Sequence, residues 1–567
     1  MAHETIADLL LDRVGDDRAG LRTRERTWSW DEVVRESAAR ASLARSLRVS
    51  GPFHIGVLLD NVPEHIFWLG AAALSGAAVV GINSTRRGAA LEAEVRHTEC
   101  QLIVTDRAGL ALLDGLDIGV ARDRFLLVDD PAYAERVAAH AGDMTGDMTS
   151  DTAGDTADDV IRDPAVTADT RMLLLFTSGT TGASKAAICS QGRLTALGHA
   201  NSAKYDIARD DICYCPMPLF HGNALMALWA PALAAGACVA LTPKFTASGF
   251  LPDVRYFGAT FFTYVGKAIS YILARPEQAD DGDNSLTHAF GTEASPEDKA
   301  AFLNRFGCRL VEGYGSSEGS GMLKQAPDGP AGALGVPARD SVRIVHPDTR
   351  ETCPPAVLDE HGRVKNSEEA IGEIVDTEGA AKFEGYYNNP AANAERVRHG
   401  WYWTGDLGYV DEAGYFYFAG RSGDWIRVDG ENTSALLTER VLRRHDAVLA
   451  AAVFGVPDPR SGDQVMAAVE IPEGTRFEEL SLPGFLSTQE DLGTKGAPRF
   501  VRVSHALPAT GSNKLRKKEM QLEGWSTDDP VYRWAGRGEP EYVVMTEDDK
   551  AALRAEFVTN GRQRFLP

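Results

Sequence analysis

Apolar runs alternate with amphipathic stretches along most of the chain, which is the pattern of strands alternating with helices. The apolar runs predicted as buried strands are HIGVLL (54–59), AAVVGIN (77–83), QLIVTD (101–106), CVALTP (238–243), ATFFTYV (259–265) and CRLVEGYG (308–315). Helices are predicted between the first three, over VPEHIFWLGAAALSG (62–76) and GAALEAEVRHTE (88–99). Strands joined through helices form parallel sheets covered by helices, so we expect a large α/β body.

One apolar segment needs separate treatment. NALMALWAPALAAGACVALTP (223–243) carries no charged residue and is long enough to cross a bilayer. Pro231 and Gly236 interrupt it. We therefore expect a short buried helix followed by a strand at ACVAL, and no membrane span.

The pattern changes after about residue 345. Short strands separated by Gly and Asp turns follow, as in YVDEAGYFYFAGR (409–421). A last segment contains a helical pattern at 434–445, strand patterns at 449–457 and 464–471, and the basic string NKLRKKEM (513–520). The predicted fold class is α/β, with a large N-terminal body of mixed, mainly parallel sheets covered by helices, a small β region, and a small mobile α+β C-terminal domain. The predicted domains are 1–421 and 422–567.

The segment 142–159, GDMTGDMTSDTAGDTADD, is a repetitive run of small and acidic residues. Such a composition buries too little apolar surface to form a core. It predicts a disordered surface insertion within the N-terminal domain.

Composition narrows the class of protein. A chain of 567 residues is too long for a single core, and its 44% hydrophobic and 25% charged residues are ordinary for a soluble globular protein. The net charge of −23 argues against nucleic acid as a partner. Seven cysteines without a CxxC pair, and an N-terminus without a basic and apolar leader, predict a cytoplasmic protein with buried thiols. Peripheral membrane contact and oligomeric state stay open.

The stretch LLLFTSGTTGASKAAI (173–188) concentrates backbone amides and hydroxyls beside one lysine. Glycines allow a backbone to approach an anion closely, so the stretch suits a phosphate, although a Gly/Ser/Thr surface turn has the same composition. Its glycine and lysine spacing is not that of the nucleotide P-loop, and the apolar residues after Lys185 are strand-like. We expect a flap between two strands over a polyphosphate.

This stretch resembles the phosphate-loop signature of the AMP-forming adenylating superfamily, which includes acyl-CoA synthetases, luciferases and peptide-synthetase adenylation domains. Three further segments resemble the superfamily's motifs in the expected order: EGYGSSEG (312–319), YWTGDLGYVDEAGYFYFAGRSGDWIRVDGEN (402–432) and PATGSNK (508–514). The matches span nearly the whole chain. KFTASGF (244–250) and RSGDWIRVDGENTS (421–434) are most similar to the fatty-acid transport protein and very-long-chain acyl-CoA synthetase branch.

The resemblance implies roles for individual residues. It implies that ATP is bound by Thr177, Ser178, Gly179, Thr180, Thr181, Gly182, Lys185, Gly291, Thr292, Glu293, Tyr314, Gly315, Ser316, Ser317, Asp406 and Arg421. It implies Glu318 and Thr177 as magnesium ligands, Lys514 and His221 as catalytic residues, and Gly430, Glu431 and Asn432 as the CoA site. Gly423 stands where the superfamily has an acidic residue or lysine as inter-domain hinge, and Asn513 stands where it commonly has glycine before the lysine.

The implied activity is that of an ATP-dependent acid–CoA ligase using ATP, Mg²⁺ and CoA. A carboxylic acid is converted to an acyl-adenylate with release of pyrophosphate, and then to the CoA thioester. Three alternatives stay open: an adenylating enzyme with another acceptor (an amine, a carrier protein, or activated nitrite in diazotisation), a non-catalytic nucleotide- or acyl-binding protein, and a P-loop ATPase. The identity of the acid is left open.

Overall fold

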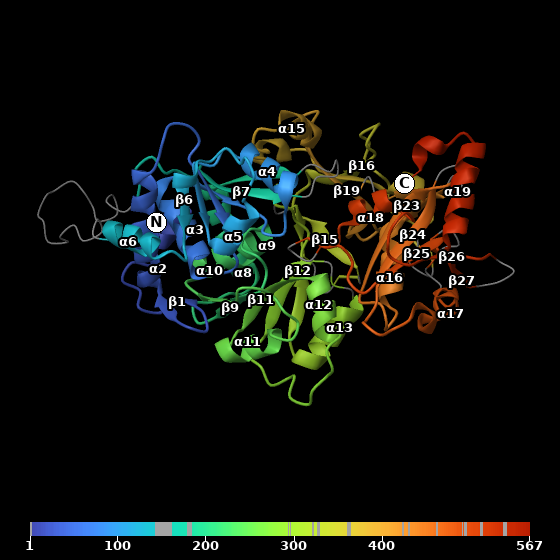
Figure 1. The fold of residues 1–567 in the computed structure, drawn as a ribbon, viewed down its shortest axis with the longest axis horizontal. Coiled ribbons are helices and arrows are strands. Elements are labelled where there is room, and N and C mark those ends of the chain that lie inside the picture. Colours follow the sequence, from blue (N-terminus) through green and yellow to red (C-terminus); the bar gives the residue numbers. More distant parts are fainter. Residues whose placement is uncertain are drawn as a thin grey trace, which may run out of the picture.

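The structure is a computed structural model of the 567-residue chain. The structure describes residues 3–141, 162–177, 184–292, 294, 296–319, 322–325, 329–330, 332–359, 364–421, 425–428, 431–460, 463–489, 492, 496–510, 514–536 and 541–566. The predicted insertion at 142–159 lies outside these residues. The N-terminal elements occupy one end of the molecule and the C-terminal ones the other, with the green and yellow elements between them (Figure 1).

The first sheet has the strand order β6-β5-β3-β4-β7-β8 and is parallel except for the last pair. Its strands are β3 (His54–Leu58), β4 (Ala78–Gly81), β5 (Leu102–Thr105), β6 (Phe125–Leu127), β7 (Arg171–Thr177) and β8 (Lys185–Ser190). Helices of this region are α2 (Trp30–Ser46), α3 (Pro63–Ser75), α4 (Gly88–His97), α5 (Arg107–Leu112), α6 (Pro131–Ala141) and α8 (Gln191–Lys204), preceded by α1 (Ile6–Leu11). The strand and helix predictions for 54–106 are therefore confirmed.

The second sheet has the order β13-β12-β11-β9-β10-β1-β2 and is parallel except for β1 with β2. Its strands are β1 (Ala19–Arg22), β2 (Thr27–Ser29), β9 (Ile212–Cys215), β10 (Cys238–Leu241), β11 (Phe261–Val265), β12 (His288–Thr292) and β13 (Arg309–Glu312). Its helices are α11 (Phe250–Phe257), α12 (Gly266–Leu273) and α13 (Pro296–Phe306). An apolar core fills the space between the two sheets, where side chains of α2, α3, β3, β7, β10 and β11 meet.

The apolar segment 223–243 is a buried helix followed by a strand, as expected, but proline does not end the helix. Helix α9 (Gly222–Ala224), a π-helical turn (Leu225–Trp229) and α10 (Ala230–Ala235) run into one another before β10. Pro231 lies at the start of α10, where the wider π turn replaces the regular hydrogen-bond ladder that proline would break. In the described part of the chain no helix meets the length and hydropathy needed to cross a membrane.

An antiparallel sheet follows, with the order β14-β15-β20-β19-β17-β16 and β18 paired to β19. Its strands are β14 (Leu323–Lys324), β15 (Ala333–Pro337), β16 (Val342–Val345), β17 (Gly372–Asp376), β18 (Val397–Arg398), β19 (Trp401–Val410) and β20 (Phe416–Arg421). Two short helices, α14 (Ser367–Ala370) and α15 (Pro390–Arg396), lie in its connections. This is the expected small β region, but it begins at Leu323 and not after residue 345, because β14, β15 and β16 pair into the same sheet.

The C-terminal elements form a smaller α+β unit. A hairpin of β21 (Trp425–Val428) and β22 (Glu431–Ser434) leads into a sheet of order β23-β24-β25-β26-β27. Its elements are α16 (Ala435–Arg443), β23 (Ala450–Pro457), β24 (Asp463–Glu470), α17 (Leu482–Ser487), β25 (Phe500–Ser504), α18 (Lys517–Glu523), β26 (Val531–Trp534), β27 (Tyr542–Val544) and α19 (Glu547–Thr559). Two apolar clusters, on alternating side chains of β23 and β24, give this unit a core on both faces of its sheet.

A buried ionic cluster joins α2, α3 and α6 inside the body. The Arg40 guanidinium, whose side chain is 5% exposed, donates to the carboxylates of Glu36 and Glu64, and Tyr133 donates its hydroxyl to Glu64 at 2.5 Å. Trp68 completes the cluster by donating its indole N–H to the Tyr133 oxygen at 2.9 Å. Such a cluster is costly to break, because Arg40 is buried and Glu64 is shielded from most of the solvent, so each needs the other's charge.

Replacing Arg40 with methionine should lower the free energy of unfolding by about 3 kcal/mol, since the half-buried Glu64 carboxylate and the buried Tyr133 hydroxyl then lose their cation. Arg35 on the same helix supplies the control, because its ion pair with Asp31 (2.7 Å) involves a guanidinium that is 65% exposed. Arg35→Met should cost less than about 1 kcal/mol. Urea unfolding of both variants beside the parent measures this, and equal losses would show that the cluster contributes no more than a surface pair.

Candidate functional site

Three segments that are distant in sequence meet at the carboxylate of Glu318. Thr177, the last residue of β7, donates its hydroxyl to Glu318 Oε1 at 3.1 Å, and Tyr386 donates its hydroxyl to the same oxygen at 3.0 Å. Glu318 is 7% exposed. Burial also raises the pKa of Tyr386, with the neighbouring Glu318 charge adding to it, so the tyrosine remains a hydroxyl donor. The structure thus brings the predicted pair Thr177 and Glu318 into contact.

Lys185 lies at the start of β8, opposite Thr177 in the antiparallel β7–β8 hairpin. Its side chain is buried, with Nζ 2.9 Å from a carboxylate oxygen of Glu395 and 5.5 Å from the centre of the Tyr386 ring. The hairpin confirms the prediction that the glycine-rich loop joins two strands. The predicted residues Ser178, Gly179, Thr180, Thr181 and Gly182 lie outside the described residues.

Arg396, at the end of α15, holds Tyr386 and the turn before Asp406 together. Its Nε donates to the Tyr386 hydroxyl oxygen at 3.1 Å, and its Nη1 donates to the main-chain carbonyls of Trp403 and Thr404. Gly405 adopts φ +73°, and a Cβ atom there would lie 2.6 Å from Arg396 Nη1. Glycine at 405 is therefore required both by the turn and by the close approach of the guanidinium.

Tyr314 and Asp406 are joined across the site by a hydrogen bond of 2.8 Å from the tyrosine hydroxyl to Asp406 Oδ2. Asp406 and Arg421 are opposite each other in the β19–β20 register, which brings the predicted ribose pair onto neighbouring strands; the Arg421 side chain lies outside the described set. Gly315 is exposed, and Ser316 closes a turn through its hydroxyl, which accepts from the Gly319 amide at 3.2 Å.

Ser317 lies against the start of α9. A Cβ atom on Gly222 would lie 2.9 Å from Ser317 Oγ, and the Ser317 carbonyl accepts a hydrogen bond of 2.7 Å from Arg193. On the other side, Gly291 and Thr292 end β12, where a Cβ on Gly291 would lie 2.4 Å from the Tyr264 carbonyl oxygen. Packing against β11 thus already requires glycine at 291. Glu293 lies outside the described residues.

His221 is the N-cap residue of α9, as the sequence predicted. Among the described residues its Nε2 has no hydrogen-bond partner, and burial together with the charge of Lys514 lowers its pKa to about 4. The imidazole is therefore neutral at physiological pH. Because the Lys514 charge contributes to this shift, we expect the two predicted catalytic residues, 293 positions apart in sequence (514 − 221), to lie on the same side of the site.

Lys514 is presented by a narrow loop. Arg516 donates its amide to the Pro508 carbonyl at 2.9 Å. The Thr510 amide donates to the Lys514 carbonyl at 2.7 Å, and the Lys514 amide donates to the Thr510 hydroxyl oxygen at 3.1 Å. Glu431 and Asn432 lie in β22, and their side chains are outside the described set. The predicted hinge Gly423 and CoA residue Gly430 also lie outside the described residues.

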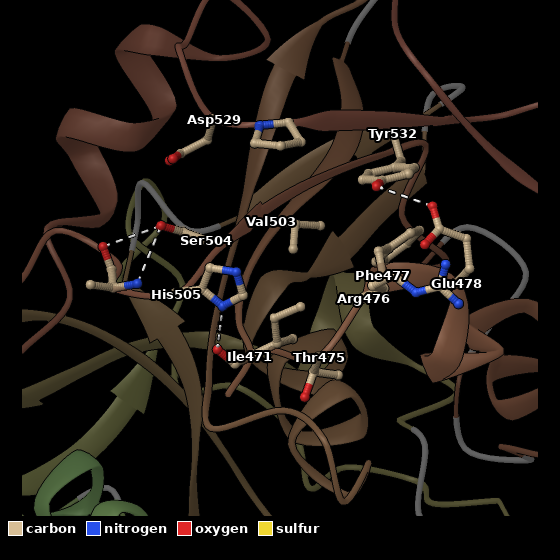
Figure 2. Close-up of a pocket in the computed structure, with 12 residues that line it drawn as sticks. Ile471, Thr475, Arg476, Phe477, Glu478, Val503, Ser504, His505, Asp529 and Tyr532 are labelled. Carbon is tan, nitrogen blue, oxygen red and sulfur yellow. Dashed lines mark hydrogen bonds between the residues drawn. The ribbon is translucent and has the colours of Figure 1, made fainter. Parts of the chain in front are cut away.

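A hollow of about 550 Å³ lies elsewhere, in the C-terminal unit. Figure 2 shows it beside Val503 and Ile471, with Tyr532 donating to Glu478 at 3.3 Å on its rim and His505 bonded to the Ile471 carbonyl oxygen at 3.1 Å. None of the predicted site residues lines it.

In the described part of the chain no group of three or more His, Cys, Asp or Glu side chains could hold a metal by itself. All seven cysteines are buried and unbridged, as expected.

Known proteins decide the family. The sequence model of the AMP-binding enzyme family matches residues 11–387, and that of the AMP-binding enzyme C-terminal domain matches residues 437–514. The chain belongs to the AMP-binding enzymes. The match confirms the resemblance identified from the four motifs.

The relatives of this AMP-binding enzyme are CoA ligases. It is 65% identical over 562 residues, 99% of each chain, to a steroid-22-oyl-CoA synthetase from Rhodococcus jostii. It is 42% identical over 531 residues, 94% of this chain and 98% of the other, to the medium/long-chain-fatty-acid–CoA ligase FadD17 of Mycobacterium tuberculosis. The enzyme is thus an AMP-forming acid–CoA ligase with ATP and CoA as substrates, which decides against the alternatives without CoA and against a P-loop ATPase.

Solved structures confirm the fold class. The anthranilate CoA ligase AuaEII, in complex with anthranoyl-AMP, has a TM-score of 0.75 and 19% identity over 93% of this chain and 98% of its own. ATP-bound MatB from Rhodopseudomonas palustris has a TM-score of 0.73 and 21% identity over 91% and 98% of the two chains.

Sequence reasoning missed Tyr386, Glu395 and Arg396. All three lie between residues 384 and 396, outside the four motifs, and the run EGYYNNP (384–390) reads as an ordinary turn. Two adjacent tyrosines before a turn were the available signal. Only the fold reveals that Tyr386 reaches Glu318 while Tyr387 turns away to donate to Glu99.

The depressed pKa of His221 predicts acid sensitivity. In the unfolded chain a histidine titrates near 6.5. Between about pH 6.5 and pH 4 the unfolded state therefore binds a proton that the folded state does not, and the free energy of unfolding falls as the pH falls. At pH 5 the protonation of His221 in the unfolded chain lowers the free energy of unfolding by about 2 kcal/mol.

His221→Gln should remove about 2 kcal/mol of the stability lost between pH 7 and pH 5, as measured by urea unfolding at both values. Lys514→Ala should raise the His221 pKa, measured by the carbon-13 shift of the labelled imidazole, while Lys518→Ala in the same basic string should not. An unchanged imidazole titration in Lys514→Ala would contradict the closeness of the two residues.

Proposed function

We propose that this enzyme activates a steroid carboxylic acid whose carboxyl carbon is C22 of the steroid skeleton, and transfers the acyl group to CoA. The observation that carries the proposal is 65% identity over 99% of both chains to a ligase named for that acyl group. The surroundings of His221 support an apolar acid, since the helical turns after it, from Leu225 to Leu233, are buried and apolar. A medium- or long-chain fatty acid is the second candidate, supported by the relative at 42% identity.

In the first step the carboxylate attacks the α-phosphorus of ATP. Lys514 places its ammonium beside the reacting carboxylate and phosphate oxygens, where positive charge stabilises the transition state.

Thr177, Lys185 and the 178–182 loop hold the phosphates, and Ser317 contacts the α-phosphate. Tyr314 stacks on adenine next to the 291–293 strip, and Asp406 with Arg421 binds the ribose hydroxyls. Neutral His221 lines the acid pocket, where it can donate one hydrogen bond to a carboxylate without forming an ion pair.

The residues around Glu318 fit Mg²⁺. A carboxylate and the Thr177 hydroxyl are the hard oxygen donors this ion prefers, and Mg²⁺ usually binds one or two carboxylates and completes its shell with substrate phosphates and water. When bound with ATP, the ion would neutralise the departing pyrophosphate. Tyr386 and Arg396 keep the Glu318 carboxylate in place.

In the second step the sulfur of the CoA thiol attacks the carbonyl carbon of the acyl-adenylate. The carbon–sulfur bond of the thioester forms, the bond from the acyl carbon to the AMP phosphate oxygen breaks, AMP leaves, and the thiol proton is released. The predicted division at residues 421 and 422 makes the C-terminal part a domain that turns about Gly423, which has the widest backbone freedom of any residue. This turn withdraws Lys514 and brings Gly430, Glu431 and Asn432 toward the acyl-adenylate, where they bind the pantetheine arm.

Acid-dependent pyrophosphate exchange and CoA thioester formation should be fastest with a C22 steroid carboxylic acid. A panel pairs this acid with octanoate, palmitate and a steroid bearing a longer acidic side chain. A pocket shaped for one length discriminates by about 10- to 100-fold per misplaced group. Faster turnover of octanoate or palmitate would favour the second candidate, and exchange without thioester formation for every acid would contradict CoA as the acceptor.

In the presence of ATP, Mg²⁺ should raise the thermal midpoint of unfolding. Tyr386→Phe should require an about 3- to 10-fold higher Mg²⁺ concentration for half of this rise, because Glu318 loses one of its two hydroxyl donors. Tyr387→Phe is a matched control, since it removes a neighbouring tyrosine hydroxyl that donates to Glu99 instead. Both variants should respond equally to ATP in EDTA. If the two shift the Mg²⁺ titration alike, Tyr386 has no part in positioning Glu318.

A further inference from the structure

A buried carboxylate, Glu470, connects the N-terminal body to the C-terminal unit. It is the last residue of β24, and 3% of its side chain is exposed. Its Oε2 accepts from Lys267 Nζ at 3.1 Å, and its Oε1 accepts from the Tyr271 hydroxyl. Lys267 and Tyr271 both belong to α12 of the body. In Figure 1, α12 lies at the boundary with the orange C-terminal elements.

The same carboxylate also holds the base of the loop that carries Lys514. Glu470 Oε2 accepts the backbone amide of Leu507 at 2.9 Å, inside the core. From Leu507 the chain enters the loop closed by Pro508 with Arg516 and by Thr510 with Lys514. Leu507 itself is 4% exposed and packs with Leu515 in the apolar cluster of the C-terminal unit. One carboxylate oxygen is thus shared between a cation of the body and the loop base.

We propose that Glu470 is a positioning residue for adenylation: it ties the loop of Lys514 to α12 of the body through Lys267 and Tyr271, and so sets where the Lys514 ammonium stands beside the substrates. The proposal rests on the role of Lys514 in the proposed function.

The geometry gives this tie a direction. Lys267 is 9% exposed and Glu470 3%, so the pair is shielded from water and strong only while the body and the C-terminal unit are in contact. Without the Lys267 cation, contact between the two would bury an uncompensated carboxylate, and separation would return Glu470 to water. Loss of Lys267 therefore disfavours the arrangement with Lys514 near His221 and leaves the separated arrangement unharmed.

The test compares two substitutions that each remove one cation at the boundary between the N-terminal body and the C-terminal unit. Lys267→Met removes the cation that donates to Glu470 Oε2, the oxygen that also accepts the Leu507 amide. Arg443→Met removes an ion pair of 3.1 Å between α16 and Asp298 of α13, about one-fifth exposed on each side. Both half-reactions are measured with the C22 steroid acid: acid-dependent pyrophosphate exchange, and thioester formation from preformed acyl-adenylate and CoA.

Lys267→Met should slow exchange by about 10-fold or more and change thioester formation by less than about 2-fold. Arg443→Met should change either rate by less than about 3-fold. Tyr271→Phe should reproduce the asymmetry in weaker form, since it removes one neutral donor. Equal slowing of both half-reactions by Lys267→Met, or equal slowing of exchange by Lys267→Met and Arg443→Met, overturns the proposal.

A double variant separates positioning from a contribution of its own. If Glu470 and Lys267 act only through Lys514, adding Lys267→Met to Lys514→Ala should slow exchange no further. Multiplied effects overturn the proposal. The carbon-13 titration of His221 supplies a second readout, because its pKa should rise in Lys267→Met as the Lys514 ammonium moves away. A wild-type exchange rate in Lys514→Ala contradicts the role of Lys514 itself, whereas a slow Lys514→Ala beside a wild-type Lys267→Met contradicts the role of Glu470 alone.

Discussion

The buried carboxylate of Glu318 is the constraint around which the rest of the site is built. A carboxylate out of water is costly unless hydrogen bonds or cations compensate it. Here the donors come from β7 of the first sheet, through Thr177, and from the segment before α15, through Tyr386. Arg396 then ties Tyr386 to the turn at Gly405, so the requirement of one carboxylate orders three separate parts of the chain. In the proposed function ATP binds where these parts meet, because they supply hydroxyls and cations that a polyphosphate can share.

The two carboxylates Glu318 and Glu470 illustrate the difference between a fixed and a conditional interaction. Among the described residues, Glu318 accepts hydrogen bonds from two hydroxyls, those of Thr177 and Tyr386, and both belong to the N-terminal body. Glu470 accepts from Lys267 and Tyr271 across the boundary and from the Leu507 amide within its own unit, so only the first two contacts depend on the two units touching. In the proposed function the ligase uses both kinds: a fixed interaction that holds the nucleotide site in both reactions, and a conditional one that is released when Lys514 leaves.

The proposed division of labour also accounts for the neutral histidine. His221 lies close to a cation and away from water, and both conditions disfavour its charged form. A neutral imidazole contributes one directed hydrogen bond without drawing the carboxylate into an ion pair. The acid can therefore be held by the apolar surroundings of α9 and its π-helical turn, while the single positive charge at the reacting atoms comes from Lys514.

The sequence by itself determined the elements and the order of the motifs. Apolar periodicity placed the strands at 54–59, 77–83 and 101–106 because both faces of a parallel sheet are buried and their strands read as continuous apolar runs. The resemblance to the family could be recognised from the sequence because each motif is a contiguous string of residues. The side-chain partners that distant segments contribute to the site could not be recognised in this way. Tyr386, Arg396, Lys267 and Glu470 each lie in an unremarkable local context, and each acquires its meaning from a residue far along the chain. Only the tertiary structure decides such pairs. The strength of an interaction with a buried charge depends on the distance to its partner and on the exclusion of water, and the neighbouring residues in the sequence determine neither.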